Sequence, residues 1–196
     1  MHFQNIEFVP DGLTTDDFVL RPIVADDAEM DYAAVMESRE YLRTWEQSSW
    51  PADDFTVAAN REDLEKLERR HTARDAFTYT VMDPAATECL GCVYLMPTDA
   101  ASLSKARITP AGNRRWDEYE AAVYFWVRKS QLASGTDRVL LDVLRTWLAQ
   151  EWSLGGHLIV TNEQFAQQLG LITSTDLQLR FEIEEPDKPG RYLGFD

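Results

Sequence analysis

The stretch that decides the fold runs from residue 118 to residue 152 and reads EYEAAVYFWVRKSQLASGTDRVLLDVLRTWLAQEW. Its first part, Ala121–Val127, is a dense run of Val, Tyr, Phe and Trp, which predicts a buried strand. Its last part, residues 138–152, repeats apolar side chains at the spacing of one helix face. A short polar turn with a single glycine, Gly135, joins the two. A helix that begins after such a turn presents unpaired backbone N–H groups and the positive end of its dipole, and both attract phosphate.

This run resembles the acetyl-CoA-binding motif of the GNAT N-acetyltransferases, nearest to the branch that acetylates ribosomal proteins and other N-termini. In that family a strand ending in a Trp–hydrophobic pair precedes a turn of pattern [R/Q]-x-x-G-x-[G/A] and a helix. Counting from Trp126, the turn covers residues 132–137, and only its central Gly135 fits. Leu132 stands where Arg or Gln is expected, and Asp137 stands where a small residue is expected.

Asp137 is the departure with the clearest physical consequence. A carboxylate at roughly 5 Å from a phosphate charge repels it by about 3 kcal/mol at an effective dielectric constant near 20. The alternative interpretation is that Asp137, with Ser134 or Thr136, caps the helix itself, because acids and hydroxyls are favoured at helix starts. Main-chain donors remain available in either case.

A second segment, residues 157–171, resembles the second GNAT signature of a strand, an Asn, a helix and a Leu-Gly pair. Asn162, Leu169 and Gly170 match it, whereas Phe165 stands where a hydroxyl is common and the spacing from Asn to Gly is shorter. The resemblance implies that the main chain at the strand end, the turn and the adjoining residues bind acetyl-CoA. The cofactor-binding candidates are Phe125, Trp126, Val127, Leu132, Ala133, Ser134, Gly135, Thr136, Arg138 and Asn162.

Two residues are candidates for proton transfer. Acetyl transfer to an amine needs a base for the amine proton and an acid for the leaving thiolate. The family's Glu, four residues before the Trp, is Ala122 here, so Glu120, on the same strand face, is the candidate base. Glu120 also fits an exposed acid at a strand start. Tyr124 is the candidate acid, although its spacing distinguishes it little from Tyr192.

The remaining chain alternates strand and helix patterns in the GNAT order. We expect a strand at 18–23, two helices between 26 and 71, a hairpin at 77–96, a strand at 157–161, a helix at 162–171 and a strand at 177–183. Residues 97–117 form a polar segment with four basic residues that is either a solvated loop or a cover for phosphates. Trp45 and Trp50 either line an acceptor pocket or fill a helix junction. The order predicts a single domain over 1–196, of α+β class, with a mixed, mostly antiparallel sheet flanked by helices in three layers.

Cys89 and Cys92 form a C-x-x-C pair, which in some proteins marks redox chemistry or half of a zinc site. Here the pair lies in a predicted strand, where residues three apart face opposite sides. We therefore expect core packing and no metal.

Composition restricts the partners. A formal net charge of −15 disfavours nucleic acid and anionic membranes. No apolar run is long enough to span a membrane, and the first residues lack the pattern of a secretory signal. With two cysteines and no disulfide framework, we expect a cytoplasmic protein. The resemblance leaves a homodimer open.

The functional hypothesis is an acyl-CoA-dependent N-acyltransferase that moves acetyl from acetyl-CoA directly to a primary amine of a small molecule or peptide. The alternative is a GNAT-like protein with impaired catalysis that acts as a binding or assembly module, because Ala122, Leu132, Asp137 and Phe165 depart from the pattern.

Overall fold

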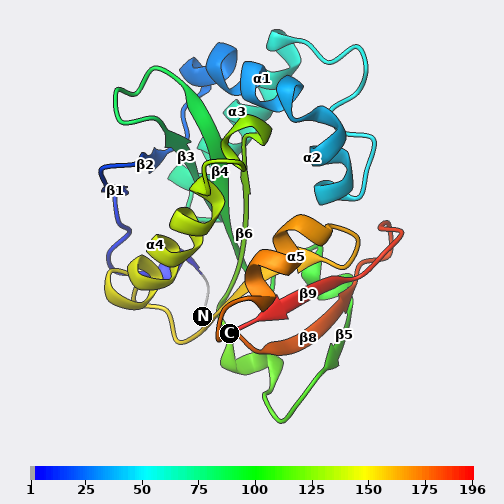
Figure 1. Ribbon diagram of the computed structural model, residues 1–196. Helices are drawn as coiled ribbons and strands as arrows, with labels where there is room; N and C mark the ends of the chain where they lie inside the picture. Colours follow the sequence, from blue (N-terminus) through cyan, green and yellow to red (C-terminus); the bar gives the residue numbers. More distant parts are fainter. Residues whose placement is uncertain (1–2) are drawn as a thin grey trace.

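The computed structural model describes residues 3–196 and contains one sheet of nine strands (Figure 1). The strand order across the sheet is β1-β2-β3-β4-β6-β7-β9-β8-β5. The strands are β1 Leu13–Thr14, β2 Val19–Pro22, β3 Phe77–Met82, β4 Cys89–Pro97, β5 Arg107–Pro110, β6 Ala121–Val127, β7 His157–Asn162, β8 Leu179–Glu184 and β9 Tyr192–Phe195. The helices are α1 Ala28–Glu37, α2 Arg39–Glu46, α3 Val57–Thr72, α4 Thr136–Gln150 and α5 Ala166–Thr173. Short 3-10 turns cover Phe3–Asn5, Ala25–Asp27, Leu103–Lys105, Trp116–Glu118 and Lys129–Gln131.

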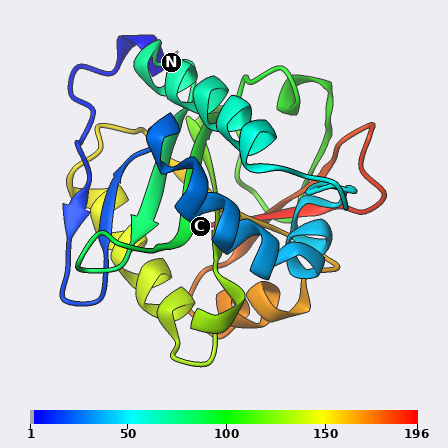
Figure 2. The same ribbon diagram turned by 90° about the horizontal axis from the view of Figure 1, so that it is seen from above.

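The helices cover the sheet from both sides, as Figure 2 shows for α1 and α3 on one side of the central strands and α4 on the other. All strand pairs are antiparallel except β6 with β7, which run parallel. A parallel pair needs a crossover, and α4 supplies it. The predicted three-layer, mostly antiparallel α+β architecture is therefore confirmed.

The core divides along the two faces of the sheet. Leu140, Leu144 and Trp147 of α4 pack on the inner positions of β3, β4 and β6. On the opposite face, Trp126 packs with residues of α1 and α2. The alternation of side chains along β6 thus sends Phe125 and Val127 to the α4 side and Trp126 to the other.

The predicted elements agree closely with the structure where the pattern is dense. The strand predicted over 121–127 has the observed bounds, and β3 and β4 form the hairpin predicted over 77–96. The helix predicted over 138–152 begins and ends two residues earlier, at Thr136 and Gln150. The first predicted helix is broken at Ser38 into α1 and α2. The tail at 190–196 contains a strand that the sequence did not indicate, β9, which inserts between β7 and β8.

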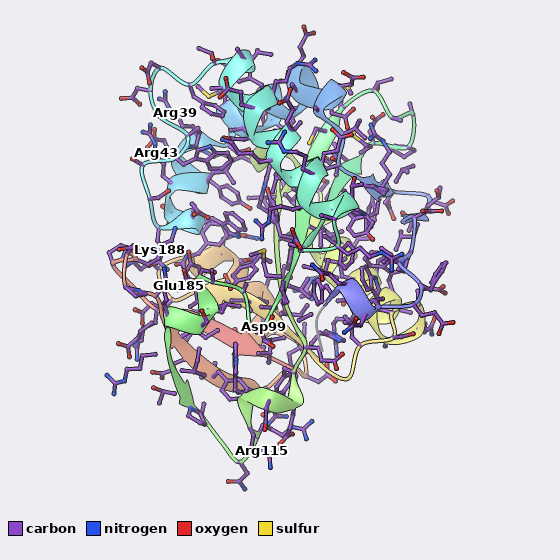
Figure 3. The ribbon with its side chains drawn as sticks, turned by 180° about the vertical axis from the view of Figure 1, so that it is seen from behind. Arg39, Arg43, Asp99, Arg115, Glu185 and Lys188 are labelled. Carbon is purple, nitrogen blue, oxygen red and sulfur yellow. The ribbon has the colours of Figure 1, made fainter. Side chains whose placement is uncertain are left out.

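The basic segment at 97–117 is partly structured. It contributes β5, which pairs with β8 at the edge of the sheet. Arg107, Arg114 and Arg115 each have a nearby carboxylate partner, Glu184, Glu118 and Asp117 respectively. Arg115 lies at the far end of the molecule from Arg39 and Arg43 of α2 (Figure 3). The segment is thus neither a plain solvated loop nor seen over the turn before α4, because its Ser102 and the buried Leu103 line a cavity on the other face of the sheet.

Candidate active site

The central strands β6 and β7 separate part-way along their length. They pair at only three positions, Ala121↔His157, Ala122↔Leu158 and Val123↔Ile159. From Tyr124 to Val127, β6 continues beside β4 but has no ladder partner on its β7 side. The backbone groups of Phe125 and Val127, which alternate with residues bonded to β4, are therefore directed into the gap between the two strands, where a ligand's amide groups can replace the missing strand.

The turn before α4 lies at the open end of this gap. Gly135 adopts a left-handed conformation with φ of 78° and precedes the first helical residue, Thr136. Ala133 and Ser134 are exposed. Within residues 3–196, no protein hydrogen bond engages the backbone N–H groups of Ala133, Ser134, Thr136 and Asp137. The predicted set of main-chain donors at a helix start is thus present and accessible, except on the side of Asp137.

Side chains from α5 and α2 occupy the gap itself. The buried Gln168 amide of α5 donates to the backbone carbonyl of Phe125 at 2.9 Å. The Tyr41 hydroxyl of α2 interacts with the backbone of Val127, and its ring packs edge-on against Phe165 at 4.7 Å between centroids. The backbone groups of β6 that do not pair with β7 are therefore partly hydrogen-bonded by the protein's own side chains.

Asp137 is buried, at 8% exposure, and accepts a hydrogen bond from Gln167 of α5. Its carboxylate therefore joins α4 to α5. It does not cap its own helix, and α4 has no side-chain cap. Ser134 and Thr136 bond to each other through their hydroxyls at 3.1 Å. Arg138 is exposed and donates to the Ser174 hydroxyl at 2.9 Å, so one cation adjoins the turn.

A cavity of about 470 Å³ reaches β6 from the opposite face of the sheet. Tyr94 and Tyr124, which are directly opposite each other on β4 and β6, lie on it. Trp45 and Trp50 also line it, so the two tryptophans contribute to a pocket. Tyr124 is the first residue of β6 beyond its last pair with β7. The cavity and the gap therefore meet at one residue.

The polar groups of this cavity have perturbed acidities. Burial, with the nearby carboxylate of Glu185, raises the pKa of the Tyr124 hydroxyl well above its ordinary value. Burial also raises the pKa of Glu185, against the opposing effect of Lys188. Lys188 pairs with Glu46 at 2.6 Å, whereas Glu185 makes no ion pair within the described residues. Figure 3 shows Glu185 and Lys188 next to each other. Tyr124 therefore stays protonated at neutral pH, and Glu185 is a carboxylate whose basicity is increased.

Two predicted site residues lie elsewhere. Glu120, at the opposite end of β6, accepts a hydrogen bond from the Gly155 backbone N–H at 2.8 Å and does not line the cavity of Tyr124. The structure does not bring Glu120 and Tyr124 together. The amide of Asn162 donates to the carbonyls of Thr44 and Trp45 at 2.8 and 2.7 Å and accepts from the Gln164 N–H, so its role is to hold the end of α2 on β7.

Sequence reasoning missed Glu185 and Gln168. Glu185 follows β8, and only the position of β8 beside the unpredicted β9 places it in the cavity. Gln168 lies three residues after Phe165 in a short helix whose apolar pattern is weak, so nothing in the sequence indicated its bond to β6. A larger cavity of about 810 Å³, lined by Trp152, Gly155 and His157 among others, lies at the paired end of β6 and β7, away from the turn.

Solved structures of other proteins are similar to this chain over nearly its whole length. The ribosomal-protein-S5-alanine acetyltransferase from Vibrio fischeri superposes with a TM-score of 0.66, at 15% identity over 94% of both chains. This is the GNAT fold. RimL, a ribosomal L7/L12 α-N-protein acetyltransferase in complex with coenzyme A, shares the GNAT fold with a TM-score of 0.64, at 13% identity over 96% of both chains.

The microcin C7 self-immunity acetyltransferase MccE, in complex with acetyl-CoA and AMP, gives a TM-score of 0.67, at 12% identity over 95% of both chains. No model of a protein family and no curated protein sequence matches the chain. The likeness is therefore one of GNAT fold at low identity. Within the described residues, no helix is long and apolar enough to cross a membrane.

Proposed function

We propose that the protein is an N-acetyltransferase that transfers acetyl from acetyl-CoA directly to a primary amine of a small molecule or peptide. The observation that carries the proposal is the meeting of two features at Tyr124. On one side of the sheet, β6 separates from β7 below an exposed helix start, and on the other side a cavity reaches the same residue. Direct transfer requires two substrates to approach one point from two sides, and this geometry supports it.

The residues at the turn fit the phosphates of acetyl-CoA. The free N–H groups of Ala133, Ser134 and Thr136, with the dipole of α4 and the nearby Arg138, form an anion-binding site. Gly135, at positive φ, has no atom within 4 Å of where a Cβ would lie, so the backbone is open there. Asp137 opposes this binding, and its bond to Gln167 directs its carboxylate toward α5.

The unpaired half of β6 fits the pantetheine arm of the cofactor. Its main chain at Phe125 and Val127 faces the gap and offers peptide groups, whereas Trp126 between them pairs with β4, and all three side chains are fully buried. Gln168 must release the Phe125 carbonyl when a ligand takes that position. Bound acetyl-CoA supplies an activated acyl thioester, and the backbone N–H groups of this strand are suited to polarise its carbonyl.

The cavity supplies the groups that move protons. Glu185 accepts a proton from the entering ammonium, directly or through water, because its raised basicity favours protonation over an ordinary glutamate. Tyr124 is protonated when the reaction begins, and its hydroxyl, at the meeting point of gap and cavity, donates this proton to the leaving thiolate. Trp45, Trp50 and Tyr94 form apolar walls for the acceptor. We therefore replace Glu120 with Glu185 as the base and keep Tyr124 as the acid.

Isothermal titration calorimetry with acetyl-CoA tests the first half of the proposal. We expect saturable binding of one ligand per chain at micromolar to low millimolar concentration. Release of free thiol in the presence of a panel of primary amines and N-terminal peptides then tests transfer. If acetyl-CoA binds but no amine leads to release of thiol, the alternative of a catalytically impaired module is supported. If millimolar acetyl-CoA gives no heat of binding, the enzyme assignment is wrong.

A further inference from the structure

A cluster of three metal-ligating side chains lies between α1 and β4, behind the proposed acceptor cavity, where the Cys92 thiol meets the hydroxyl of Tyr94. Asp31, Cys89 and Cys92 are all buried, at 4%, 0% and 1% exposure. Their ligand atoms lie within 4.8 Å of one another. Neither cysteine is in a disulfide. The proposed acetyl transfer uses none of the three.

A β-bulge brings the two cysteines to the same face of the sheet, which corrects the expectation that they face opposite sides. Cys89 is opposite Met82 and Gly91 is opposite Val81, so Leu90 is an extra residue without a partner on β3. Cys92 is opposite Thr80. Met82 and Thr80 are two apart on β3 and share a face, so their partners Cys89 and Cys92 share it too.

The two S···O separations match the edges of a tetrahedral zinc site. The Sγ atoms of Cys89 and Cys92 lie 3.7 and 3.6 Å from Oδ1 of Asp31. With Zn–S near 2.3 Å and Zn–O near 2.0 Å, a regular tetrahedron has S···O edges of about 3.5 Å and S···S edges of about 3.8 Å. Asn60 donates to the other carboxylate oxygen, Oδ2, at 2.9 Å, and so directs Oδ1 toward the thiols.

Unpaired polar atoms surround this cluster. Oδ1 of Asn60, Oγ1 of Thr80 and Oδ2 of Asp27 are buried without a hydrogen-bond partner in residues 3–196. Asn60 bonds Asp31 directly, Thr80 is the cross-strand partner of Cys92, and Asp27 is close enough to Asp31 to interact with its charge. Buried polar atoms without partners are rare in folded proteins, and they commonly mark a water or an ion.

We propose that Asp31, Cys89 and Cys92 bind a structural zinc ion, with a water held by the neighbouring oxygens as the fourth ligand. On binding, Zn²⁺ displaces one proton from each thiol and coordinates the carboxylate. The net charge of the group stays at −1, because two positive charges enter and two protons leave. The soft thiolate pair favours zinc over magnesium or calcium. The ion links α1 to β4 at the base of the helical layer.

The test uses the full chain, reduced, stripped with a chelator and titrated with Co²⁺ and then Zn²⁺ alone. We expect one Co²⁺ per chain with sulfur-to-cobalt charge-transfer absorption, displacement of Co²⁺ by Zn²⁺, and a higher melting temperature with zinc. Both thiols should resist alkylation in the zinc form and react after chelation. The proposal would be overturned if the thiols reacted equally slowly with and without chelator and no cobalt absorption appeared. Burial would then be the only cause of their protection.

Variants separate the site from non-specific binding. Asp31→Asn keeps the shape of the side chain but removes the charge of a direct ligand. We expect it to weaken Zn²⁺ binding by roughly 100-fold or more, because loss of even an outer-shell partner costs about 10- to 100-fold. Cys92→Ser should abolish the charge-transfer absorption. Asp83→Asn, in the turn between β3 and β4, is the control and should bind zinc like the wild type. If Asp31→Asn and Cys92→Ser fold and bind zinc as tightly as the wild type, the assignment is wrong. If neither folds, the wild-type cobalt spectrum decides.

Discussion

At the residue scale, Asp137 places a negative charge where the proposed function requires the protein to bind the negatively charged phosphates of acetyl-CoA. Its carboxylate is buried at the head of α4 and bonded to Gln167. Asp137→Asn keeps a hydrogen-bond acceptor for Gln167 and removes the charge, so we expect acetyl-CoA to bind roughly 10- to 100-fold tighter, the equivalent of at most about 3 kcal/mol. Calorimetry measures the change. Asp142→Asn, an exposed acid on the same helix, controls for overall charge, and equal affinities in all three proteins would show that Asp137 does not face the ligand.

Glu185 is the second residue on which the proposed chemistry depends. Burial raises its pKa, so the ionised base forms only above the range of an ordinary glutamate. The rate of transfer should therefore rise with pH through this raised pKa. Glu185→Gln should lower kcat by about 100-fold and remove that limb of the pH profile. Its neighbour Glu184, which lies near Arg107, supplies the control variant Glu184→Gln. An unchanged pH profile in Glu185→Gln would exclude Glu185 as the base.

At the element scale, the bulge in β4 depends on one glycine. Gly91 has φ of 155°, and a Cβ there would lie 2.1 Å from the backbone oxygen of Trp126 on β6. Gly91→Ala therefore forces β4 and β6 apart. We expect a loss of about 3 kcal/mol or more, which lowers Tm by about 6–12 °C in a domain of this size. Gly112→Ala, with no atom within 4 Å of its Cβ, should leave the melting curve unchanged. Equal melting temperatures for both variants would contradict the close contact.

The elements also show where sequence patterns suffice and where they do not. Dense apolar patterns placed β3, β6 and α4 correctly, because each element's burial is encoded in its own residues. The pairing of β9 between β7 and β8, the bulge at Leu90 and the bond from Gln168 to Phe125 depend on contacts between distant segments. No local pattern carries such contacts, which is why the turn before α4 was predicted and Glu185 was not.

At the scale of the whole molecule, the helical layer is tied to the start of the α4 turn by an ion pair. Arg128 pairs with Glu37 at 2.6 Å, and the Ser130 N–H donates to the same carboxylate. Partial burial raises the pKa of Glu37, but the bonds from Ser130 and Arg128 outweigh it and the pKa is lowered. The lowered pKa of Glu37 stabilises the folded protein fully at a pH above the pKa of glutamate in the unfolded chain, which is near 4.3. This stabilisation is lost as the pH falls through the lower pKa of the folded state.

We therefore expect Glu37→Gln to reduce the free energy of unfolding by about 1 kcal/mol at pH 7, since the pair is partly exposed. The difference from the wild type should shrink toward zero at a pH of about 3. Urea unfolding at both pH values measures it, with the exposed Glu29→Gln on the same helix as control. A difference that is the same at both pH values would mean that packing, not charge, accounts for the loss.

The central claim is that acetyl-CoA binds at the head of α4, in the gap between β6 and β7. Amide chemical shifts of the isotope-labelled protein, followed during titration with acetyl-CoA, test it most directly. The account predicts saturable shifts for Ser134, Gly135 and Thr136 and for the unpaired half of β6. Shifts that gather instead at Gly155 and His157, beside the larger cavity at the paired end of the strands, would contradict it, and so would a spectrum that millimolar ligand leaves unchanged.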